Sequence, residues 1–66
     1  MTATVTSIYR AVVSGGIPPD ASPADLAWLE RVHRWHAEHS VQRGAWHGRQ
    51  AFLCSELLAT MKESAP

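Results

Sequence analysis

Residues 22–42 read SPADLAWLERVHRWHAEHSVQ, and this stretch decides the fold that the sequence predicts. Ser22 is a preferred N-cap residue, Pro23 suits the first helical position, and Asp25 completes a capping-box pattern. With an advance of about 100° per residue, apolar side chains gather on one half of the helix and charged side chains on the other. The sequence therefore predicts an amphipathic helix over residues 22–42.

The apolar half of this helix carries polar rings as well as apolar side chains. His36 falls near its middle, with His33 and His39 on either side. We therefore expect the His36-centred side to be buried. Glu30 and Arg34 lie on the charged half at i,i+4 spacing, where an ion pair contributes about 0.2–0.5 kcal/mol. That half is interpreted as the solvent-exposed face.

Residues 4–14 have apolar side chains at positions i, i+3, i+4 and i+7, which fits one face of a helix better than the alternation of a strand. These side chains are Val5, Ile8, Tyr9 and Val12. The many β-branched residues leave a strand as the alternative. Gly15 and Gly16 follow and are expected to end the helix, because glycine readily adopts a positive φ.

A third helix is predicted over residues 46–62, after a break at Gly44, which we expect to adopt a left-handed cap conformation. Its predicted core face holds Trp46, Ala51, Leu53, Cys54, Leu57, Leu58 and Met61, joined by His47 and Gln50. The predicted fold is all-α: one small domain, residues 1–66, in an up-down-up arrangement. In it a helical hairpin, 22–42 and 45–62, is crossed by the N-terminal helix. A hairpin that dimerises into a four-helix bundle is the alternative.

The composition narrows the class of protein. The chain has 66 residues, and its six basic and six acidic residues cancel. A neutral chain offers little attraction to nucleic acid or anionic lipid, and no run of about 18 apolar residues is present. We expect a cytoplasmic protein with no membrane or nucleic-acid partner. A domain of this size buries only about 60% of its unfolded surface, which favours association with a protein partner or with itself.

A metal site is the alternative function that the side chains suggest. The candidate ligands for zinc or another transition metal are His33, His36, His39, His47 and Cys54. No paired-cysteine or paired-histidine motif brings them together locally, so half-buried histidines with no metal are the simpler interpretation and no cofactor is predicted. Glu30 and His33 form one E-x-x-H pattern, as in di-iron bundles, but a second inward-facing glutamate is missing.

The sequence also raises two further functions, nucleophilic catalysis and DNA binding. Cys54 as a nucleophile needs a base within hydrogen-bond reach, and His47 lies seven residues earlier, about 10 Å along a helix axis. We therefore expect no catalytic residues and a buried Cys54. Arg43, His47 and Arg49 stand near the start of the third helix as in a helix-turn-helix, a minor DNA-binding alternative that the neutral charge disfavours.

The tryptophans give the favoured functional prediction. Tryptophan is enriched among the residues that dominate binding at protein interfaces. The candidate partner-binding residues on the Trp/His face are Trp28, Val32, Trp35, His36, His39 and Trp46. The sequence thus predicts a small non-enzymatic interaction module, such as an adaptor, inhibitor or accessory subunit. Simple core packing of the three tryptophans is the alternative.

Overall fold

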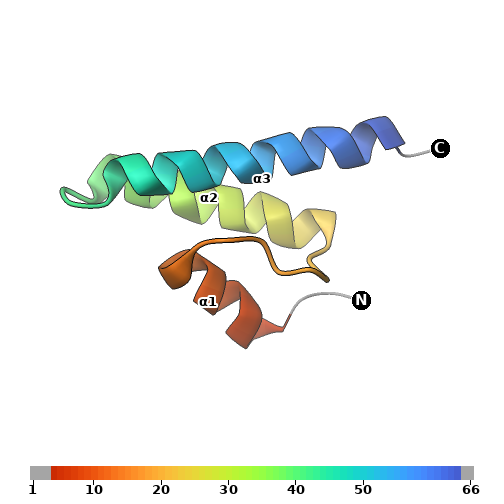
Figure 1. The fold of residues 1–66 in the computed structure, drawn as a ribbon, viewed down its shortest axis with the longest axis horizontal. Helices are drawn as coiled ribbons and strands as arrows, with labels where there is room; N and C mark the ends of the chain where they lie inside the picture. The colour runs from red at the N-terminus through yellow and green to blue at the C-terminus, as the bar shows by residue number, and fades with distance from the viewer. Residues whose placement is uncertain (1–3, 65–66) are drawn as a thin grey trace.

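The computed structural model describes residues 4–64, which form three helices. The helices are α1 (Val5–Ser14), α2 (Pro23–His39) and α3 (Gly44–Ser64). α2 and α3 run antiparallel and pack closely along each other, and α1 lies inclined across one face of this hairpin, against α2 (Figure 1). The predicted all-α architecture is confirmed, and the N-terminal segment is a helix rather than a strand.

The start of α2 is fixed by the capping box that the sequence predicts. The Ser22 hydroxyl accepts a hydrogen bond from the Asp25 backbone N–H at 3.2 Å. The Asp25 carboxylate accepts one from the Ser22 backbone N–H at 3.0 Å, and Pro23 occupies the first helical position. Such an N-cap contributes about 1 kcal/mol to the stability of α2 and so reduces fraying of its first turn.

The turn between α2 and α3 lies earlier than predicted, at residues 40–43 rather than 43–45. α2 ends at His39, and the extended Ser40 places its hydroxyl to accept a hydrogen bond from the Arg43 N–H at 3.0 Å. Gly44 is the first residue of α3 and does not have a positive φ, so the expected left-handed cap is wrong. Glycine is needed at position 44 because the start of α3 lies close to the backbone of α2. A Cβ there would lie 2.9 Å from the carbonyl oxygen of Ala37.

The chain leaving α1 is anchored to α3. Gly15 and Gly16 have φ angles of 88° and 86°, as their predicted role in ending the helix requires. A Cβ at Gly15 would lie 2.6 Å from a ring carbon of Trp46. The Gly16 backbone N–H donates to the Gln50 side-chain oxygen at 3.1 Å. The two glycines therefore let the connector lie against the first turns of α3.

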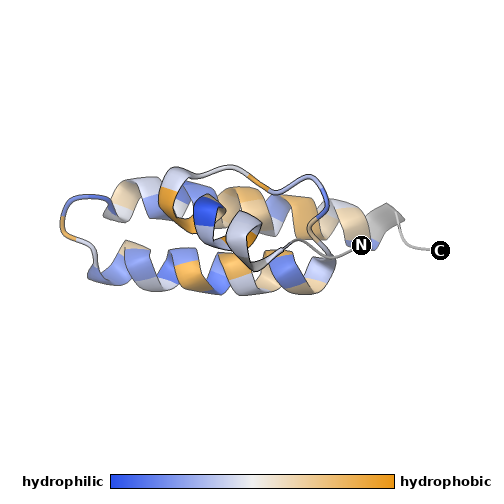
Figure 2. Cartoon of the chain, turned by 90° about the horizontal axis from the view of Figure 1, so that it is seen from below, coloured by the Kyte–Doolittle hydropathy of each residue, from blue (hydrophilic) through white to orange (hydrophobic). Residues whose placement is uncertain are grey.

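The core is small and includes two histidines. Its buried hydrophobic residues are Ala11, Leu26, Leu29, Ala51 and Cys54, and the buried polar residues are His33 and His47. Ala11, Leu29 and Cys54, one from each helix, form the central cluster. Seen from the side on which α1 lies, polar and apolar residues alternate along all three helices (Figure 2). Trp35, Phe52 and Leu53 are 56%, 62% and 48% exposed, so part of the apolar surface lies outside the core.

The buried side of α2 is centred elsewhere than predicted. His33 is 0% exposed, whereas His36, expected at the centre of the buried side, is only partly buried. The buried direction is set by two neighbours at once, since α3 packs along one side of α2 and α1 lies on the adjacent side. Our expectation for His36 is wrong because a helical wheel averages hydrophobicity and does not locate these neighbours.

The predicted core face of α3 is confirmed only in part. His47, Ala51 and Cys54 are buried, whereas Leu53 and Leu57 are 48% and 38% exposed. α2 covers one side of α3, and α1 lies against α2 rather than along the leucine side of α3. The helical wheel of α3 predicted the correct half to be buried, but α2 covers only part of that half.

The paired glycines give the first prediction. Alanine at Gly16 should lower the free energy of unfolding by about 1–2 kcal/mol because of the positive φ. At Gly15, whose φ of 88° and ψ of 179° are essentially restricted to glycine, the backbone alone should cost about 1–3 kcal/mol. At Gly15 the added methyl group also meets Trp46, so Gly15→Ala should cost about 1–3 kcal/mol more than Gly16→Ala, whose methyl group meets nothing within 4 Å. Urea unfolding followed by circular dichroism measures both. Equal losses would contradict the packing of Trp46 against the connector.

Candidate functional site

Six aromatic and imidazole rings meet at the closed end of the hairpin, where α2 ends and α3 begins. We call them the ring cluster: His33, Trp35, His36, His39, Trp46 and His47. On α2, His39 stacks on Trp35 with ring centroids 4.2 Å apart and planes 15° from parallel. His36 meets the other side of Trp35 edge-on at 5.1 Å. The cluster therefore begins at the solvent-exposed edge of α2.

The cluster continues from α2 into α3 through stacked histidines. His36 stacks on His47 at 4.7 Å, and His47 lies 5.1 Å from His33. Trp46 meets both His33 and His47 nearly perpendicularly, at 5.8 and 4.8 Å. An uninterrupted series of ring contacts therefore connects exposed Trp35 with buried His33.

The centre of the cluster is a hydrogen bond between two buried imidazoles. Nδ1 of His33 lies 2.8 Å from Nδ1 of His47, and the two side chains are 0% and 5% exposed. One nitrogen must donate and the other accept, so at least one ring is neutral. Nε2 of His33 is buried without a hydrogen-bond partner, a cost of about 1–3 kcal/mol. The hydrogen bond between His33 and His47 can therefore form only while at least one of the two imidazoles is neutral.

The surroundings of the pair disfavour its protonation. Burial lowers the pKa of His33 to about 4, with smaller contributions from the positive charges of His47, His36 and Arg43. Burial also lowers the pKa of His47, followed by the charges of His36 and Arg43. Every charged group that acts on these two rings is thus a cation when ionised. No carboxylate is among the groups that shift these two pKa values, so none of them favours the charged form of either ring.

Arg43 closes the cluster on the side of the turn. Its guanidinium carbon lies 3.9 Å from the centroid of the Trp46 ring, a cation–π contact. Its Nη1 donates to the backbone carbonyl of Val13 at 3.1 Å. These two contacts join the turn to α1 and to the start of α3. They also fix the orientation of the guanidinium, which has further N–H donors that these two contacts do not use.

The predicted partner-binding residues divide into two groups. Trp28 and Trp35 are 44% and 56% exposed on α2. Trp35, His36, His39 and Trp46 belong to the ring cluster, and Val32 is half-buried. Trp46 also packs against the connector at Gly15, which gives it a structural role. Among the predicted partner-binding residues, the exposed tryptophan surface is therefore carried by Trp28 and Trp35 of α2.

The candidate metal ligands are only partly gathered. His33, His36 and His47 meet in the cluster, but Cys54 lies in the apolar core beside Ala11 and Leu29. Within residues 4–64, no group of three or more His, Cys, Asp or Glu side chains is arranged to hold a metal ion. The hydrogen bond between His33 and His47 also occupies one nitrogen of each ring.

Cys54 is poorly placed for nucleophilic chemistry. Its thiol is 0% exposed. Burial raises its pKa, and the nearby Glu30 carboxylate raises it further. Because the thiolate is the reactive form of cysteine, a buried thiol held in its protonated form is a weak nucleophile. The environment of Cys54 therefore fits a packing role.

Residues of α1 that the sequence did not associate with the site adjoin it. Tyr9, Val12 and Val13 line a pocket together with His36 and His47. The sequence pattern places Tyr9 and Val12 on one helix face and gives Val13 no role. The path of α1 across the hairpin depends on the connector and on the small Ala11, and no local motif reports that path.

Comparisons with protein-family models, with curated proteins and with solved structures gave no match to this chain. In the part of the chain that the structure describes, no helix is both long enough and apolar enough to cross a membrane.

The buried histidine pair predicts a stability that depends on pH. The pKa of His33 is about 4 in the folded chain and about 6.5 when unfolded, so the unfolded state binds more protons between these values. Stability from neutral His33 is fully present above pH 6.5 and is lost as the pH falls toward 4. The loss attributable to His33 should reach about 2 kcal/mol at pH 5. Urea unfolding between pH 8 and 4.5 measures it.

Matched substitutions assign this pH dependence to one residue. His33→Gln, which cannot ionise, should remove most of the acid-induced loss. His39→Gln, at an exposed position on the same helix, should retain it. An unchanged dependence in His33→Gln would show that His33 is not buried and neutral.

Proposed function

We propose that this chain is a small non-enzymatic interaction module that binds another protein chain through the outer surface of α2. One observation carries the proposal: large apolar side chains are left outside the core. Within the described residues, the exposed ones are Tyr9, Val13, Trp28, Trp35, Val41, Phe52, Leu53, Leu57 and Met61. Of the same described residues, five hydrophobic ones form the buried core. Exposed apolar side chains that gather into one patch are typical of interaction surfaces.

The α2 surface suits a binding site better than the other exposed apolar side chains do. Trp28 and Trp35 are seven residues apart, about 10 Å along the helix axis, with half-buried Val32 between them. Each offers a large ring and an indole N–H donor. Tryptophans in such positions account for much of the binding energy in protein interfaces.

The Trp35 ring is held in place before any partner arrives. His39 stacks on one side and His36 meets it edge-on. Nδ1 of His39 lies 2.7 Å from the Trp35 carbonyl oxygen, which can only accept, so Nδ1 carries the proton and the imidazole is oriented. A ring already fixed in one orientation loses less conformational entropy on binding, which favours affinity.

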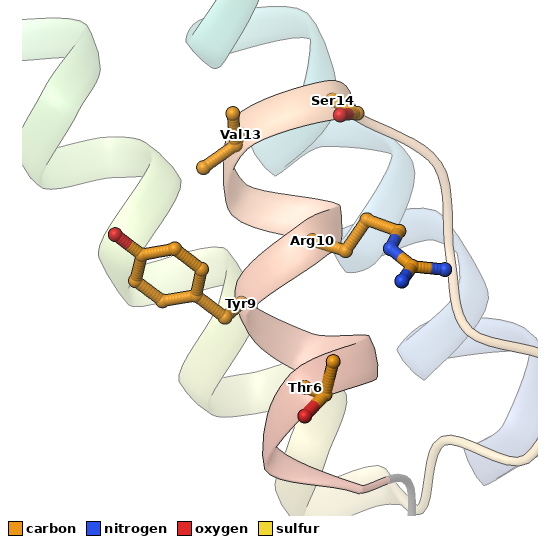
Figure 3. A pocket seen from close by; sticks show the side chains of 5 residues that line it. All are labelled: Thr6, Tyr9, Arg10, Val13 and Ser14. Atoms are coloured by element: carbon orange, nitrogen blue, oxygen red, sulfur yellow. The ribbon is translucent and has the colours of Figure 1, made fainter.

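Further apolar surface lies on α1. Tyr9 and Val13 project from one side of this helix, with Arg10 on another, around a shallow pocket of about 450 Å³ (Figure 3). This pocket is lined by Thr6, Tyr9, Arg10, Val13 and Ser14. α1 packs against α2, so a partner bound along α2 can extend its contacts onto α1.

The proposal predicts a selective effect of one tryptophan. Trp35→Ala should weaken association with a second copy or another protein by about thirtyfold or more, the effect of losing a dominant interface residue. Most helicity should remain, because the side chain is 56% exposed. Sedimentation velocity over a range of concentrations measures self-association. Crosslinking in the source cells, with reactive groups placed along α2, detects other partners.

Phe52→Ala supplies the matched control. Phe52 is 62% exposed, and it borders a surface formed by α3 residues alone, Ala45, Gly48, Arg49 and Leu53. Its loss should leave association unchanged. Normal association by Trp35→Ala, or loss of association by Phe52→Ala alone, would overturn the assignment of the surface to α2.

A further inference from the structure

A second pocket lies between the C-terminal half of α1 and the closed end of the hairpin. Its volume is about 270 Å³, and its lining residues are Tyr9, Val12, Val13, His36, Arg43 and His47. The α1 residues supply an aliphatic and aromatic wall, whereas the hairpin supplies two imidazoles and a guanidinium. The pocket therefore has one apolar side and one side rich in nitrogen donors.

The polar side of this pocket is uniformly basic. His36 and His47 stack against each other at 4.7 Å, and Arg43 stands beside them. None of the six lining residues carries a carboxylate. The positive charges of His36 and Arg43 also act on His47 and on the buried His33 behind it. Arg43 supplies a positive charge at the pocket and the two imidazoles supply ring nitrogens, so a negatively charged group meets an attractive surface there.

Arg43 is arranged to receive such a group. Its contact with the Trp46 ring and its hydrogen bond to the Val13 carbonyl hold the guanidinium at the edge of the pocket. One of its five N–H donors is used by Val13, which leaves others for a ligand. The single ion pair seen in the described residues joins Arg34 to Glu30, and it does not involve Arg43. A planar carboxylate matches the geometry of a guanidinium well.

We propose that this pocket binds a small organic carboxylate with an apolar body, its carboxylate directed at Arg43 and the two histidines and its apolar part lying against α1. The volume limits the ligand to about the size of a single substituted aromatic ring. Val12 and Val13 contact the body of the ligand, and Tyr9 stands at the rim. This site adjoins the exposed tryptophan surface of α2 through His36, but its assignment does not depend on the proposed interaction function.

Benzoate is the probe, and benzamide is its neutral counterpart of nearly the same shape. Titrations at pH 7 are followed by the NMR signals of the histidine rings. Benzoate should shift the signals of His36 and His47 in a saturable manner, and benzamide should bind about tenfold to a hundredfold more weakly, since hydrogen bonds to a charged group are lost. Equal affinity for the two compounds would overturn the proposal, as would the absence of saturable shifts.

Two arginine variants locate the site. Arg43→Gln should weaken benzoate binding about tenfold to a hundredfold, whereas Arg49→Gln, on the surface of α3 away from this pocket, should leave it unchanged. His36→Gln serves as a second test if Arg43→Gln disturbs the turn, and it should also weaken binding. Equal affinity in the Arg43, His36 and Arg49 variants would show that benzoate binds elsewhere and would overturn the assignment.

Discussion

The structure depends on one buried polar contact, the 2.8 Å hydrogen bond between Nδ1 of His33 and Nδ1 of His47. It joins α2 to α3 near the turn. An apolar contact at this place would tolerate small displacements of the helices, whereas a hydrogen bond tolerates few, because it requires both a short distance and a particular ring orientation. Sliding one helix by a single residue would turn one ring away and leave two buried polar groups unpaired. The pair therefore fixes the register of the hairpin, at the cost of an unpaired Nε2 on His33.

The composition of the core affects which side chains lie at the surface of the molecule. Two positions at the α2–α3 contact are taken by imidazoles, and the contact of α1 is made by the small Ala11. Such a core is closely packed but narrow, so it cannot accommodate two tryptophans and several leucines. Trp28, Trp35 and Leu53 therefore lie at the surface even though the chain is rich in apolar residues. The same arrangement that defines the hairpin leaves apolar surface exposed.

The sequence predicted the features that depend on local chemistry. The capping box at Ser22, the helix ends at Gly15 and Gly16, and the ion pair between Glu30 and Arg34 at 2.7 Å are all present. Each involves residues within four positions of one another, or a single backbone conformation. The overall three-helix architecture followed from the periodic segments and the short connections between them.

What the sequence did not predict depends on contacts between distant segments. His33 rather than His36 is fully buried because α1 and α3 approach α2 from two directions. Gly44 is required by the proximity of the Ala37 carbonyl, and the role of Arg43 follows from a bond to Val13, thirty residues earlier. A helical wheel contains none of these distances. The sequence therefore named the rings that meet at the closed end of the hairpin but not the contacts between them, which depend on tertiary packing.

His36 links the two surfaces that the structure offers to other molecules. Its ring contacts Trp35 on the exposed side of α2, and it stacks on His47 at the pocket beneath α1. A change in the orientation of His36 therefore alters the surroundings of both Trp35 and His47. Coupling between two binding sites is reciprocal in free energy, so if both proposed sites bind, each ligand would alter the affinity of the other by the same factor. Only one imidazole separates Trp35 from the pocket, so the physical route for such coupling is short.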